Sequence, residues 1–92
     1  MSTSVDKPRE HEADEIIAEF ARLLRPVLAD GATKREPHTW QQTTVGTHVL
    51  KIARHWDRWV RGERHDADSG AHPLVHVAFR ALAIAWREGR HG

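Results

Sequence analysis

The chain has 92 residues, of which 39% are apolar, a net charge of +1 and no cysteine. This length fits a single small globular domain, and the lack of cysteine excludes disulfide frameworks and thiolate chemistry. The weak net charge argues against a strong nucleic-acid-binding surface, and the lack of an apolar run of about 18 residues predicts a cytoplasmic protein without a membrane span.

The first part of the chain predicts a flexible leader over residues 1–8 and then the start of a single helical domain that covers residues 9–89. From Arg9 onward, apolar side chains recur at helical spacing between Ile16 and Leu28. Pro26 is expected to kink or end this first helix, because proline lacks the amide proton and clashes with the preceding turn. Residues 30–38 are predicted to form a loop.

Two further helices are predicted on either side of a short acidic loop. The second begins between residues 39 and 44 and ends near Gly62, the loop covers residues 62–71, and the third runs from His72-Pro73 to about Glu88. The third helix is apolar nearly all round, which is typical of a helix buried on most sides. We therefore predict an all-α fold, a small bundle of about three helices that is completed by formation of a homodimer or a higher homo-oligomer.

Histidines and carboxylates are concentrated around the predicted loop. Glu63, Asp66 and Asp68 offer hard oxygen donors that suit Mg²⁺ or Mn²⁺ together with substrate phosphates. The alternative is a solvated turn in which Asp68 or Ser69 caps the third helix. Both interpretations stay open, since one residue can cap the helix while its neighbours bind a metal ion.

Three other features allow two interpretations each. His72 and His76 lie four residues apart, a spacing that can chelate a transition metal but also occurs in capping or surface histidines. His48 and His55 share one helix face, where partly buried, hydrogen-bonded histidines are commoner than metal ligands. Trp40, at the edge of a loop, can either stack on a nucleobase or belong to the core.

The order of residues through this region carries a family resemblance. The matching positions are Arg54-His55, Trp59, Gly62-Glu63, Asp66, Asp68-Ser69-Gly70, Leu74, His76 and Ala78, with Gly31-Ala32-Thr33-Lys34 and Trp40 upstream. In this spacing the chain resembles the phage and bacterial dATP/dGTP diphosphohydrolase N-terminal domain family. The resemblance covers roughly residues 23–86.

The resemblance implies a small all-α domain that uses a divalent metal, Mg²⁺ or Mn²⁺, to hydrolyse purine deoxynucleoside triphosphates to the monophosphate and pyrophosphate. The implied polar site is His55, Glu63, Asp66, Asp68 and His76, with Lys34 near the phosphates. Together with the patterns above, the predicted roles are catalytic for His55, Glu63 and His76; substrate-binding for Lys34, Trp40, Arg54 and Arg58; and metal-binding for Glu63, Asp66, Asp68 and His72.

Two departures from the family pattern support an alternative function. Pro73 stands where the family usually has a histidine, and Arg80 stands where an asparagine is expected. Both changes lie on the third predicted helix. They favour a non-catalytic helical module that keeps the scaffold and binds a nucleotide or a partner protein.

Overall fold

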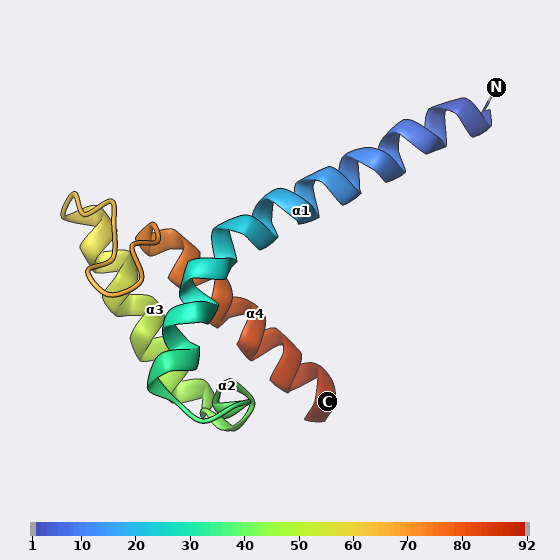
Figure 1. Ribbon diagram of the computed structural model, residues 1–92. Helices are drawn as coiled ribbons and strands as arrows, with labels where there is room; N and C mark the ends of the chain where they lie inside the picture. Colours follow the sequence, from blue (N-terminus) through green and yellow to red (C-terminus); the bar gives the residue numbers. More distant parts are fainter. Residues whose placement is uncertain (1, 92) are drawn as a thin grey trace.

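The computed structural model describes the backbone of residues 2–91 and the side-chain surroundings of residues 11–90. Within this part of the chain there are helices and no strand, so the all-α class with three long helices is confirmed. The elements are α1 (Ser2–Lys34), α2 (Thr39–Gln42), α3 (Val45–Val60) and α4 (Pro73–His91) (Figure 1). Among the described residues, no helix is both long and apolar enough to cross a membrane.

Helix α1 is longer at both ends than the sequence pattern predicts. The prediction that a loop begins at residue 30 is wrong, because α1 does not end at Pro26 and continues to Lys34. The kink expected at Pro26 stays a prediction. Its last turn is held by an ion pair between Lys34 Nζ and Asp30 Oδ2, 3.1 Å apart, at the i,i+4 spacing that stabilises helices. At the other end α1 begins at Ser2, inside residues 1–8; the division of the chain at residue 8 stays a prediction.

Helices α3 and α4 form the main packed pair, and α1 and α2 both contact α4. Thr44 caps the N-terminus of α3, because its side-chain oxygen accepts a hydrogen bond from the Thr47 N–H at 3.2 Å. Helix α3 ends before Gly62, whose φ of 103° is strained for residues with a side chain. Helix α4 starts at Pro73, where a missing amide proton costs no hydrogen bond, and continues beyond the predicted end at Glu88.

The apolar core among the described side chains is small. It contains Val27, Ala71 and Ala83, and Pro73 is also fully enclosed. In the single chain α4 is not covered on all sides, since Leu82 is 60% exposed, and its burial in an oligomer stays a prediction. The N-terminal half of α1 projects away from the other helices (Figure 1), and its described apolar residues Ile16 and Ile17 are exposed. The Cα radius of gyration, 15.9 Å, exceeds the value of about 12 Å expected for a compact domain of this length.

Candidate functional site

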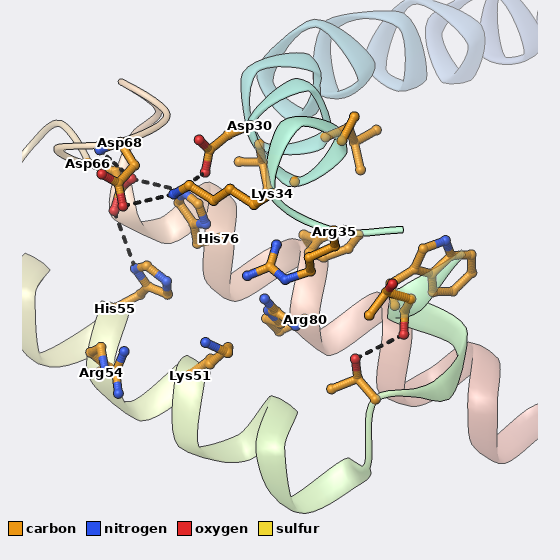
Figure 2. A pocket seen from close by; sticks show the side chains of 18 of the residues that line it. Asp30, Lys34, Arg35, Lys51, Arg54, His55, Asp66, Asp68, His76 and Arg80 are labelled. Carbon is orange, nitrogen blue, oxygen red and sulfur yellow. Dashed lines mark hydrogen bonds and ion pairs between the residues drawn. The ribbon is translucent and has the colours of Figure 1, made fainter. Parts of the chain in front are cut away.

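A cavity of about 400 Å³ lies where the C-terminal turns of α1 meet α2, α3, α4 and the loop before α4 (Figure 2). Its walls bring together residues from segments that are far apart in the sequence. Eight of the predicted site residues line it: Lys34, Trp40, Arg54, His55, Arg58, Asp66, Asp68 and His76. Glu63 and His72 are not among the lining residues. The roles assigned to all ten residues stay predictions.

Asp66 organises the loop at one end of the cavity. Its buried carboxylate accepts hydrogen bonds at Oδ2 from the N–H of Asp68 (3.1 Å), the N–H of Ser69 (2.9 Å) and the Ser69 hydroxyl (3.2 Å). On the other side Oδ1 lies 3.6 Å from Arg58 Nη1. Burial alone would raise the pKa of Asp66, but the hydrogen bonds and the nearby His76 outweigh it and lower the pKa. Asp66 is therefore a charged, fixed anchor for the loop.

His55 and His76 flank this carboxylate as a stacked pair. Their ring centroids are 4.3 Å apart with an angle of 15° between the planes, and they lie 4.0 Å and 3.7 Å from the Asp66 oxygens. Burial, reinforced by His76, lowers the pKa of His55 to about 4. Burial also lowers the pKa of His76, whose Nε2 lies 2.8 Å from Ser69 Oγ. Both imidazoles are thus neutral near pH 7.

His55 differs from His76 in its hydrogen bonding. Within the described part of the chain, His55 Nδ1 is buried and has no hydrogen-bond partner. A neutral imidazole on a cavity wall, with a carboxylate beside it, can accept a proton from a bound water molecule. The geometry is compatible with the predicted catalytic role.

Lys34 links α1 to the loop. Its Nζ lies 3.0 Å from Asp68 Oδ2 and 3.1 Å from Asp30 Oδ2 (Figure 2), and these bonds raise the pKa of Lys34. The predicted position of Lys34 at the site agrees with this placement. Asp30, which was not predicted, joins the site because α1 continues past Pro26.

The cavity wall carries an excess of positive charge, which suits a polyanionic ligand. Its acidic lining residues are Asp30, Glu36, Asp66 and Asp68. Its cationic lining residues are Lys34, Arg35, Lys51, Arg54, Arg58 and Arg80.

Three of these cations, Arg35, Lys51 and Arg80, were not predicted as site residues. Burial lowers the pKa of Lys51, and the charges of Arg80 and Arg54 lower it further. The position of Lys51, three residues after His48 and four before His55, was a signal that it shares their helix face.

The four predicted metal ligands do not converge. Among the described residues, no group of three or more His, Asp or Glu side chains is placed to hold a metal ion. The Asp66 carboxylate accepts hydrogen bonds from its own loop, and the Asp68 carboxylate forms an ion pair with Lys34. Glu63 Oε2 lies 4.0 Å from Arg58 Nε, outside the cavity. His72 Nδ1 accepts a hydrogen bond from the Leu74 N–H at 3.1 Å, so it is His72 that caps the start of α4.

Trp40 lies on α2 and lines the cavity. Its ring centroid is 4.7 Å from that of Trp86 on α4, with the planes inclined by 57°. The side chain is therefore part of the packing between α2 and α4 and, at the same time, part of the cavity wall. The two interpretations of Trp40 do not exclude each other.

Comparison with protein-family models gave a match over nearly the whole chain. Residues 4–92 match the family described as dATP/dGTP diphosphohydrolase, N-terminal. The match includes the cavity and extends beyond the resemblance noted for residues 23–86. No curated protein and no solved structure matched the chain in the same comparisons.

Proposed function

The chain belongs to the dATP/dGTP diphosphohydrolase N-terminal family, and we propose that it binds a purine deoxynucleoside triphosphate in the cavity and hydrolyses it to the monophosphate and pyrophosphate. One observation carries this proposal: a cavity with an excess of cationic side chains has a buried, neutral His55 on its wall. The cations suit the triphosphate, and the Asp66 carboxylate beside His55 favours the imidazolium that would form when His55 accepts a proton from water.

In the proposed reaction, water attacks the α-phosphorus, the bond from that phosphorus to the bridging oxygen breaks, and pyrophosphate leaves. His55 accepts the proton of the attacking water, and Asp66, 4.0 Å away, stabilises the imidazolium that forms. Lys34, Arg54 and Arg58 offset the negative charge of the phosphates. Trp40, which also lines the cavity, offers an indole face on which the base can stack.

Mg²⁺ or Mn²⁺ belongs to the proposal as an ion that enters with the triphosphate. The predicted set of Glu63, Asp66, Asp68 and His72 does not fit a protein-held metal, because the described residues gather no three-ligand group. Mg²⁺ commonly needs only one or two carboxylates in addition to substrate phosphates. Asp30 and Asp68 are the cavity carboxylates whose present partner is the Lys34 ammonium.

Pyrophosphate release from dGTP and dATP, measured with Mg²⁺ or Mn²⁺, tests the proposed reaction. We expect His55→Gln to lower kcat by roughly 10²–10⁴-fold, the usual contribution of a general base. The dissociation constant for dGTP should change much less, because the cationic wall stays intact. His65→Gln is the matched control, since His65 is exposed and does not line the cavity. Equal kcat values for the two variants would contradict the role of His55.

A second candidate function is a non-catalytic nucleotide-binding module on the same scaffold. Pro73 and Arg80, the two departures from the family pattern, are the features that favour it. This candidate predicts that dGTP binds and that Arg54→Gln weakens binding, while concentrated protein releases no pyrophosphate. If the wild-type protein neither binds nor hydrolyses dGTP, both candidates are wrong.

We also propose that the chain forms a homodimer through α1. One face of α1 carries four apolar side chains that are 44–65% exposed: Ile16, Ile17, Phe20 and Leu23. The side chains of residues 12–19 include four acidic groups and no basic one, whereas Arg22 and Arg25 follow. An antiparallel pair of α1 helices would bury the apolar face of both copies and set the acidic part of one beside the basic part of the other.

Sedimentation velocity tests the dimer. We expect the wild-type protein to sediment as a dimer at micromolar concentration and Phe20→Glu to sediment as a monomer, because a carboxylate would be buried in the apolar contact. Ala18→Glu adds the same charge on the opposite face of α1 and should leave the dimer intact. A wild-type monomer, or equal behaviour of the two variants, would contradict the α1 contact.

A further inference from the structure

Arg80 on α4 is a buried cation that lines the cavity. It is only 9% exposed, and its Nε is buried without a hydrogen-bond partner among the described residues. The guanidinium Nη1 lies 3.2 Å from Nδ1 of His48, and its central carbon lies 5.4 Å from the centre of the Phe79 ring. No described carboxylate forms an ion pair with it.

A buried charge without a counter-charge is costly, so buried arginines are normally paired with an acid or with a ligand. The surroundings of Arg80 make the cost larger, because burial and the nearby Arg35 both lower its pKa. His48 does not compensate for the charge. Burial lowers the pKa of His48 too, so this imidazole is neutral and supplies only a hydrogen-bond acceptor.

His48 instead positions the guanidinium. It is 1% exposed and comes from α3, and its contact with Arg80 joins α3 to α4 beneath the cavity. Nη1 is held by His48 and Nε is buried without a partner, while the side chain of Arg80 lines the cavity. A planar guanidinium with free N–H groups matches the oxygen geometry of a phosphate.

Two other cations surround this position. Figure 2 shows Arg35 from the end of α1 and Lys51 from α3 near Arg80, apart from the carboxylates of Asp66 and Asp68. The charges of Arg80 and Arg35 each lower the pKa of Lys51, which is consistent with this proximity. Three cations, Arg35 just after α1, Lys51 on α3 and Arg80 on α4, thus line the cavity together.

We propose that Arg80, with Arg35 and Lys51, forms a phosphate-binding subsite that holds phosphate groups of the nucleotide. This inference rests on the proposed function, because it assigns part of the same cavity to the phosphates. It also gives Arg80 a role of its own. The arginine supplies a buried counter-charge for the ligand.

Titration calorimetry with inorganic pyrophosphate tests the subsite without a nucleoside. The wild-type protein should bind pyrophosphate, and Arg80→Gln should bind it at least about tenfold more weakly, as for loss of a charge-assisted hydrogen bond. Arg61→Gln is the matched control, because it removes the same charge from an exposed side chain whose partner is Asp57, 2.9 Å away. No pyrophosphate binding by the wild type, or equal binding by both variants, would overturn the subsite.

A measurement on the wild-type protein does not depend on whether Arg80→Gln folds. In nitrogen-15 NMR spectra the Nε–H resonance of Arg80 should shift when pyrophosphate is added, because an anion bound by the guanidinium changes the electronic environment of the whole planar group. An Arg80 Nε–H resonance that stays unchanged at saturating pyrophosphate would overturn the inference.

The results separate this inference from the proposed hydrolysis. If Arg80→Gln loses pyrophosphate binding while the wild-type protein releases no product from dGTP, the subsite stands and the hydrolysis fails. If the wild-type protein hydrolyses dGTP while Arg80→Gln binds pyrophosphate normally, the hydrolysis stands and the subsite fails.

Discussion

Asp66→Ala should lower the free energy of unfolding by about 3 kcal/mol, because it removes the acceptor of three hydrogen bonds and the partner of Arg58. The Asp68 and Ser69 N–H groups would lose their partner at a part-buried position. For a domain of this size, such a loss corresponds to a fall in Tm of roughly 12–24 °C. Urea denaturation and thermal melting followed by circular dichroism measure both quantities.

Asp68→Ala is the control for this prediction. It removes the same charge two residues away, but the Asp68 side chain is 68% exposed and pairs only with Lys34 across the surface. An exposed ion pair contributes about 1 kcal/mol or less, so the variant should stay close to the wild type. If both variants lose the same stability, Asp66 is not the anchor of the loop.

Acidification should destabilise the fold through His55 by up to about 3 kcal/mol. Burial holds the pKa of His55 at about 4 in the folded protein, against 6.5 for an ordinary histidine. Between these values the unfolded chain binds the proton and the folded chain does not. The contribution of neutral His55 to the free energy of unfolding is therefore fully present above about pH 6.5 and is lost as the pH falls toward 4. His76, whose pKa burial also lowers, acts in the same direction.

Urea denaturation at a series of pH values checks this prediction. His55→Gln keeps a polar side chain that does not titrate, so its stability should depend less on pH across this range. His11→Gln removes an exposed histidine on α1 and should keep the wild-type dependence. A His55→Gln profile that is as steep as the wild-type profile would show that other groups cause the acid sensitivity.

The fold class was predictable because α3 and α4 have clear helical periodicity and Gly62 ends α3 as expected. Helix α1 continues past Pro26 because a single proline removes only one hydrogen bond, and the Asp30–Lys34 pair supports the turn that follows. Helix α2 has only four residues, too few to show a period. Its formation depends on packing, shown by the contact between Trp40 and Trp86.

The candidate site was predictable where its residues belong to one ordered segment, which placed His55, Asp66 and His76 close together. Glu63 and His72 were misplaced because their positions depend on loop turns, and both lie outside the cavity. Arg35 and Arg80 were missed because sequence does not show where α1 crosses the other helices. In the sequence Arg80 is only a departure from a family pattern; its burial without an acidic partner is visible only in three dimensions.

The N-terminal half of helix α1 projects away from the other helices, whereas its C-terminal turns line the cavity (Figure 1). About 27 Å of helix separates Ile16 from Lys34, at 1.5 Å per residue. Val27, in the C-terminal part of α1, is the residue of this helix that is buried in the apolar core, and it also lines the cavity. A partner that binds the projecting part of α1 would therefore be joined through one continuous helix to Asp30 and Lys34, which line the cavity.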